Sequence, residues 1–298
     1  NTLPYTTIHI LEHDDLVPDD LLCTLYAVGP AGDKLPELSR MIFNGASAIK
    51  KFAGRNPVGF FPGELGVEPL AFAAAAITVS AVIDADATGG RAVPEITQDL
   101  FVLQGKELSP SIAVDTSGAT HLFEHLDGYT LEAEIRALVS RTRDSVLVFD
   151  HLITGKEKTL LCFGVLKKAI EVAMTGIGLH TIDQGIFRDI SYNQKDGFLA
   201  GTLEIASETS RYRLFFQNEH LVLLRNGKPI VTCPSLIMLF NIEDKPIHNA
   251  EIQRCLGQRV TIRSMPPETI WRSPKGHELF GPRHFGLDFD VCYFDETV

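Results

Sequence analysis

The sequence has few cysteines and no closely spaced pair of them. The five it contains are isolated along 298 residues: Cys23, Cys162, Cys233, Cys255 and Cys292. An odd, scattered set is typical of reduced thiols, which argues against a secreted disulfide scaffold and favours a cytoplasmic protein. No apolar run is long enough to cross a bilayer, and the acidic residues 1–20 do not resemble a signal peptide, so we expect no membrane partner.

Motifs of several enzyme classes are also missing. The sequence contains no HExxH, GxSxG or Walker motif, so we expect neither a zincin nor a serine hydrolase, and no nucleotide cofactor. The ten histidines form no motif; His121 and His125 are four apart, but a zinc site would need a third ligand. Acidic residues outnumber basic ones by 38 to 27, giving a formal charge of −11, so a nucleic acid is not an expected partner.

The first of two expected domains, residues 1–178, alternates short apolar runs with helical patterns. Helices are expected at 36–53, 66–76, 130–143 and 158–174, and strands at 79–84 and 145–149. Alternating strands and helices predict an α/β domain with a largely parallel sheet.

The second expected domain, residues 179–298, is rich in short β-prone segments. It is predicted to be β-rich, either a sandwich or a partial barrel, with strands at 201–205, 212–217, 220–224, 229–232, 236–240, 258–263 and 287–293. The pair Asn226-Gly227 lies between two of these segments and predicts a tight hairpin.

The densest polar cluster, residues 84–95 (DADATGGRAVPE), directly follows an apolar run. It is therefore expected beyond the carboxyl end of a strand, where open α/β sheets bind ligands. Asp84 and Asp86 could hold a divalent metal such as Zn²⁺, or one of them could act as a base, with Arg91 as an anion clamp. The alternative is a structural turn, in which the aspartates accept backbone N–H groups and pair with Arg91.

Two further stretches carry candidate side chains. Glu64 precedes the helix expected at 66–76, whose N-terminus a carboxylate could stabilise. Arg272 and Arg283 lie on expected loops near the C-terminus. Their guanidinium groups could grip a carboxylate or, equally, bond to loop carbonyls.

Taken together and in order, these stretches resemble the S-methyl thiohydantoin desulfurase family. The family, formerly a domain of unknown function, takes part in bacterial ergothioneine breakdown, and its members are often encoded beside or fused to hydantoinase/oxoprolinase subunits. The matching segments are 62–66 (PGELG), 84–95, 216–219 (FQNE), 234–237 (PSLI), 257–260 (GQRV) and 281–286 (GPRHFG). Family members usually open with a Gly-rich stretch that precedes the point where this sequence starts.

The resemblance implies an α/β N-terminal domain, a β-rich C-terminal domain, and hydrolysis of hydantoin-like rings. Carried onto this sequence, it makes Glu64, Asp84, Asp86, Arg91 and Glu95 the first site candidates. Arg283 and Glu219 come second, as residues that bind the substrate.

The leading hypothesis is a cytoplasmic, homo-oligomeric hydrolase of a cyclic amide or S-methyl thiohydantoin. A carboxylate among Asp84, Asp86 and Glu95, alone or with a divalent metal, would activate water, and Arg91 or Arg283 would hold the substrate's carboxylate. The alternative is a non-catalytic accessory subunit that docks on a hydantoinase/oxoprolinase partner. A metabolite-binding regulator ranks third, since it would need a further partner domain, which we do not expect in this sequence.

Overall fold

The computed structural model describes residues 7–29, 37–108, 110–195 and 198–294. The chain divides into two compact units, the N-terminal one reaching to Ile170 and the C-terminal one beginning at Glu171. The division falls within helix α5 (Val165–Thr175). Among the described residues, no helix is both long enough and apolar enough to cross a membrane.

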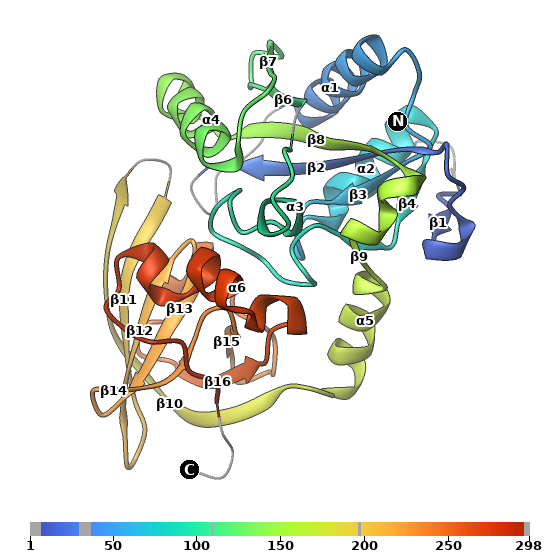
Figure 1. Ribbon diagram of the computed structural model, residues 1–298. Helices are drawn as coiled ribbons and strands as arrows, with labels where there is room; N and C mark the ends of the chain where they lie inside the picture. Colours follow the sequence, from blue (N-terminus) through green and yellow to red (C-terminus); the bar gives the residue numbers. More distant parts are fainter. Residues whose placement is uncertain (1–6, 30–36, 109, 196–197, 295–298) are drawn as a thin grey trace. The chain divides into compact units, whose positions relative to one another are not determined.

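The N-terminal unit is built on a seven-stranded mixed sheet with the strand order β1-β4-β3-β2-β8-β6-β7 (Figure 1). The parallel part comprises β1 (Ile10–Leu11), β4 (Ala81–Ile83), β3 (Gly59–Pro62) and β2 (Leu21–Val28). The antiparallel part adds β8 (Val146–Thr154), β6 (Ser111–Val114) and β7 (Thr120–Phe123). A separate two-stranded ribbon joins β5 (Ala85–Asp86) to β9 (Cys162–Phe163). The predicted α/β class is confirmed.

Helices cover both faces of this sheet. Helices α1 (Leu38–Ala53) and α2 (Glu68–Thr78) contribute to one apolar cluster, and α3 (Leu100–Leu103) and α4 (Gly128–Thr142) contribute to the other. Along β2, Leu22 belongs to one cluster and Cys23 to the other, as the alternation of side chains on a strand requires. Burial on both sides explains why this strand is apolar along most of its length.

The helix pattern at 158–174 proved to be interrupted, whereas the other three expected helices are present within a few residues. Residue 36, where the first of the expected helices was predicted to begin, lies outside the described residues. In the interrupted stretch a 3-10 helix (Gly155–Leu160) and β9 precede α5. Gly164, with φ of 74°, separates β9 from α5, and this left-handed conformation cannot continue a helix.

The C-terminal unit is an antiparallel sheet that curls into a half-barrel, with the order β14-β13-β12-β11-β10-β16-β15. Its strands are β10 (His180–Lys195), β11 (Phe198–Ala206), β12 (Arg211–Gln217), β13 (Glu219–Arg225), β14 (Lys228–Thr232), β15 (Leu236–Phe240) and β16 (Arg259–Met265). The curl brings β13 close to β15, where His220 Nδ1 donates to the carbonyl of Ile237 at 2.9 Å. The β-rich prediction is confirmed, in its partial-barrel form.

The hairpin predicted at Asn226-Gly227 joins β13 to β14. The φ angles of these residues are 51° and 82°, as a type I′ turn requires at both central positions. The strand expected at 287–293 is wrong, because the described residues there have no regular structure. The carbonyl of Cys292 accepts the backbone N–H of Thr232, but the N–H of Cys292 donates to the side-chain hydroxyl of Thr232 and not to a backbone carbonyl. The paired backbone hydrogen bonds of a β-ladder therefore do not form there. Helix α6 (Pro274–Phe280) precedes this segment.

Candidate active site

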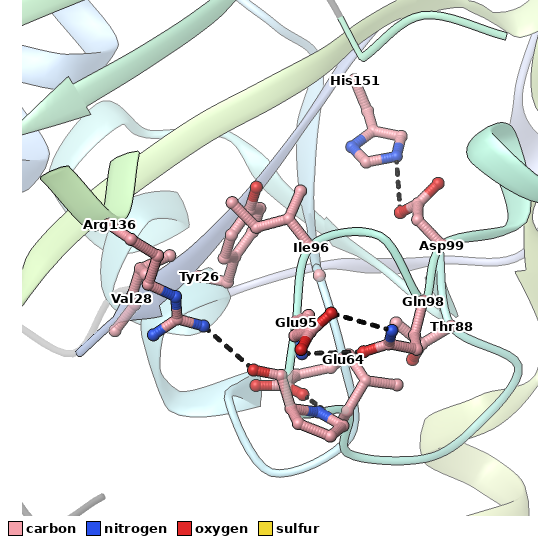
Figure 2. Close-up of a pocket in the computed structure, with 14 residues that line it drawn as sticks. Tyr26, Val28, Glu64, Thr88, Glu95, Ile96, Gln98, Asp99, Arg136 and His151 are labelled. Atoms are coloured by element: carbon pink, nitrogen blue, oxygen red, sulfur yellow. Dashed lines mark hydrogen bonds and ion pairs between the residues drawn. The ribbon is translucent and has the colours of Figure 1, made fainter. Parts of the chain in front are cut away.

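A pocket lies at the carboxyl edge of the parallel strands in the N-terminal unit (Figure 2). It contains about 430 Å³ of space, part of it open to solvent. Its walls come from the end of β2, the loops after β3 and β5, helix α4 and strand β8; the lining residues are Tyr26, Ala27, Val28, Gly63, Glu64, Thr88, Val93, Pro94, Glu95, Ile96, Gln98, Asp99, Arg136 and His151. Ligands of open α/β sheets bind at this edge.

Two carboxylates that the sequence suggested, Glu64 and Glu95, line this pocket. Glu64 Oε2 accepts the backbone N–H of Val93 at 2.6 Å, which ties the loop after β3 to the loop that carries Glu95. The carboxylate of Glu95 accepts from the hydroxyl of Thr97 at 3.1 Å and from the amide of Gln98 at 3.4 Å. These two donors are neutral, and they help to orient the carboxylate of Glu95.

Asp86 is fully buried and holds its own loop. Its carboxylate accepts the N–H groups of Gly89 at 2.9 Å and Gly90 at 2.7 Å, and the hydroxyl of Thr88 at 3.2 Å. Burial raises the pKa of Asp86 to about 7, against the lowering effect of these donors. The turn alternative therefore describes this carboxylate, which shapes the pocket wall through Thr88.

Asp84 has a similar structural contact, because its Oδ1 accepts the N–H of Leu166 at 2.7 Å. Among the described residues, no group of three or more His, Cys, Asp or Glu side chains is arranged to hold a metal ion. His121, which was considered for zinc together with His125, pairs with Asp115 at 2.9 Å. The residues suggested as metal ligands, Asp84 and Asp86, therefore do not fit a tetrahedral zinc site.

The three residues expected to bind substrate are not among the described residues that line the pocket. Arg91 is buried, and its Nε donates to the carbonyl of Ala92 at 3.2 Å. Arg283 belongs to the C-terminal unit, where its guanidinium lies 3.0 Å from the carboxylate of Asp290. Glu219 is the first residue of β13 in the same unit.

The pocket also contains a chain of ionisable side chains that the sequence interpretation missed. Its centre is His151 on β8, whose Nδ1 lies 2.6 Å from Asp150 Oδ1. Figure 2 shows its contact with Asp99, where Nε2 lies 3.0 Å from Oδ2. The hydroxyl of Tyr26 donates to the other oxygen of Asp150 at 2.6 Å. Both ends of the chain, Tyr26 and Asp99, line the pocket.

His151 carries a positive charge at neutral pH although it is only 3% exposed. Burial lowers the pKa of His151, but the carboxylates of Asp99 and Asp150 outweigh that effect and raise it to about 10. The rings of Phe61 and Phe101 stand edge-on to the imidazole, with centroids 6.0 and 4.5 Å away. These apolar neighbours keep water out, which strengthens the attraction between the charges.

The backbone at His151 is irregular as well. Its φ is 46°, a left-handed conformation that is unfavourable for a residue with a side chain. The register between β2 and β8 shifts there, between the pairs Thr24–Asp150 and Leu22–Ile153, so His151 lies in a β-bulge. Bulges redirect side chains and are frequent beside active sites.

Helix α4 supports the loop that forms the opposite wall. Arg136 Nη2 donates to the carbonyl of Pro94 at 2.9 Å, and Glu132 accepts the N–H of Ile96 at 2.5 Å. Arg136 and Glu132 also pair with each other at 2.6 Å. Burial raises the pKa of Glu132, and the neighbouring Arg136 opposes that effect. This buried pair thus fixes the backbone on both sides of Glu95.

Comparison with known proteins places the chain in a family. No curated protein matches it. A crystal structure of a protein from Chromobacterium violaceum has a similar fold, with a TM-score of 0.76 and 15% identity over 96% of this chain and 86% of that chain. Family models described as S-Me-THD-like, N-terminal domain, and S-Me-THD-like, C-terminal domain, match residues 2–125 and 156–293. The chain therefore belongs to the S-Me-THD-like family, that of S-methyl thiohydantoin desulfurase, as its motifs predicted.

Proposed function

We propose that the protein hydrolyses a hydantoin-like five-membered ring, with an S-methyl thiohydantoin as the leading substrate class, and that the pocket of the N-terminal unit is the active site. Membership of the S-Me-THD-like family supports the substrate class. The observation that carries the proposal is the presence in one pocket of two carboxylates, Glu64 and Glu95, and of a buried His151 that is paired with Asp99. Carboxylates accept hydrogen bonds, so they suit a ring that carries N–H groups.

Glu95 is the base in this proposal. Thr97 and Gln98 orient its carboxylate, and the loop that carries it is fixed by Glu64 and by Arg136. A positioned general base contributes about 10²–10⁴-fold to a rate. The other two candidates accept backbone N–H groups: Asp86 those of its own loop, and Asp84 that of Leu166.

The reaction replaces the sulfur substituent of the ring by oxygen. Glu95 takes the first proton of a water molecule, whose oxygen adds to the ring carbon bearing the sulfur, and passes that proton to the ring nitrogen of the former C=N bond. The carbon–sulfur bond then breaks while the new hydroxyl becomes a carbonyl and gives its proton to Glu95. The sulfur takes up one proton and leaves as a thiol, while Glu95 releases to solvent the proton that it received from the hydroxyl. The products are a hydantoin and a thiol, and no oxidant or reductant is consumed.

The test is to incubate the purified protein with an S-methyl thiohydantoin and to measure the hydantoin product by chromatography, which the protein's own thiols do not disturb. Glu95→Gln should reduce the rate by about 10²–10⁴-fold. Glu157→Gln is the matched control, because Glu157 also accepts a threonine hydroxyl, at 3.2 Å from Thr154, but is not among the lining residues. Circular dichroism checks that each variant is folded.

Each outcome has a definite meaning. Turnover that Glu95→Gln abolishes and Glu157→Gln preserves supports both the substrate and the base. Turnover that survives in Glu95→Gln overturns the assignment of the base. No turnover by folded protein overturns this substrate class and favours the accessory-subunit alternative, which binding to a hydantoinase/oxoprolinase subunit would then test.

A further inference from the structure

The ionisable side chains of Tyr26, Asp150, His151 and Asp99 form a series of close contacts that begins and ends at the pocket wall. Two of its contacts are hydrogen bonds of 2.6 Å, from Tyr26 to Asp150 and between Asp150 and His151 Nδ1, and the third is an ion pair of 3.0 Å between His151 Nε2 and Asp99 Oδ2. His151 Nδ1 hydrogen-bonds to Asp150, whereas Nε2 lies 3.0 Å from Asp99 Oδ2 as an ion pair and has no hydrogen-bond partner among the described residues. Asp99 is the member of the chain that can pass a proton from His151 into the pocket.

From this arrangement we propose that Asp99, supplied with a proton by His151, protonates the leaving sulfur, and that Asp150 and Tyr26 position the imidazole. The inference rests on the hydrolase function proposed above. In that reaction, negative charge develops on the sulfur as the carbon–sulfur bond breaks. An alkyl thiolate is a strong base and leaves more readily when it is protonated.

The proton moves in two short steps. The Nε2 proton of His151 transfers to Asp99 Oδ2, which donates it to the sulfur, so that a neutral imidazole remains with its Nδ1 proton directed at Asp150. Asp99 Oδ1 meanwhile accepts the N–H of Phe101 at 2.7 Å, which keeps the carboxyl group oriented. After the thiol has left, the proton that Glu95 took from the hydroxyl returns through solvent to the imidazole, and the cycle closes.

A purely structural role explains this arrangement less well. Burying Asp99 and Asp150 together with an imidazolium that packs against Phe61 and Phe101 carries a desolvation cost that apolar residues would avoid. The left-handed backbone at His151 adds a further cost. By contrast, Asp115 and His121 form an Asp–His pair whose histidine is about a third exposed, and this pair is the natural control.

The experiment compares two leaving groups. A nitrophenyl thiolate leaves without a proton, whereas a methyl thiolate needs one. Asp99→Asn should lower kcat on an S-methyl thiohydantoin by about 10²–10³-fold and on the S-(4-nitrophenyl) analogue by less than about tenfold. Residue 99 is the N-cap of α3, and an asparagine there can still accept the N–H of Phe101, so the variant should fold. Tyr26→Phe should show the same bias to a smaller extent, and Asp115→Asn should change neither rate.

Equal losses on the two substrates would overturn the inference, because a structural defect does not distinguish leaving groups. A second measurement is independent of turnover: nitrogen NMR of the histidine rings at pH 8.5 should find both nitrogens of His151 protonated, and Asp150→Asn should remove that signature. A neutral His151 in the wild-type protein would refute the proton donor, whatever the substrate. Absence of turnover with a doubly protonated His151 would instead refute the proposed substrate and, with it, the assignment of the proton's destination.

Discussion

The ion cluster around His151 should make the stability of the N-terminal unit depend on pH above neutrality, and His151→Gln should remove that dependence. The pKa of His151 is about 10 in the folded protein, against an ordinary value of 6.5. A pKa raised by folding means that the proton stabilises the folded state. The contribution is fully present below pH 6.5 and is lost as the pH rises through 10.

The magnitude follows from the two pKa values. Their difference of about 3.5 corresponds to about 5 kcal/mol at about 1.4 kcal/mol per pH unit. Between pH 7 and pH 9.5 the wild-type protein should lose about 3 kcal/mol of unfolding free energy through this group, and His151→Gln should lose none of it. At pH 7 the variant should be less stable by about 3–5 kcal/mol, since Asp99 and Asp150 remain buried without their cation.

Urea unfolding at the two pH values measures the effect. Far-UV circular dichroism follows the long helices α1 and α4 of the N-terminal unit, while the single tryptophan, Trp271, reports on the C-terminal unit as an internal reference. His121→Gln is the control, because it removes a histidine from a partly exposed pair in the same unit. A loss between pH 7 and 9.5 that is as large in His151→Gln as in the wild type would refute the reasoning.

Three other substitutions test other parts of the structure. In the wild-type protein the unfolding free energy should fall by about 3 kcal/mol as the pH rises from 4 to 7, because the carboxyl of Asp86 has a pKa of about 7 when folded but ionises near pH 4 when unfolded. Asp86→Asn should abolish this fall, and urea unfolding of both proteins between pH 4 and 7 measures it. Gly45→Ala should cost about 1–3 kcal/mol by thermal melting, since a Cβ there would lie 2.0 Å from the ring of Phe149. Asn226→Ala should cost about 1 kcal/mol of C-terminal stability by tryptophan fluorescence, because alanine is disfavoured at φ of 51°.

The parts of the fold that the sequence predicted well are those with local signals. The apolar stripe of α1, which buries Met41, Ile42 and Ile49, repeats with the period of a helix, and the Asn226-Gly227 turn requires two positive φ angles that few residue pairs tolerate. The long strand β10 gave no such signal. Polar residues interrupt its sequence, and neighbouring strands on both sides supply the pairing that holds it together.

The candidate site was predicted in its location more than in its chemistry. The carboxyl edge of the sheet was expected near residues 84–95, and Glu64 and Glu95 do line a pocket there. The local pattern could not show which carboxylate faces the pocket. An aspartate followed by Thr-Gly-Gly can bind its own turn, as Asp86 does, or a ligand, and only the tertiary structure decides between them.

The contacts around His151 could not be predicted from local patterns, because Tyr26 and Asp99 come from a strand and a loop that are distant from His151 in the sequence. One signal was nevertheless present. Asp150 and His151 interrupt a strand, β8, whose other residues are almost all apolar, and two adjacent ionisable residues cannot both point to solvent from a strand. Such a pair in a buried strand needs partners of compensating charge from elsewhere in the fold. An ionisable pair inside an apolar strand therefore marks a candidate site before the identity of its partners is known.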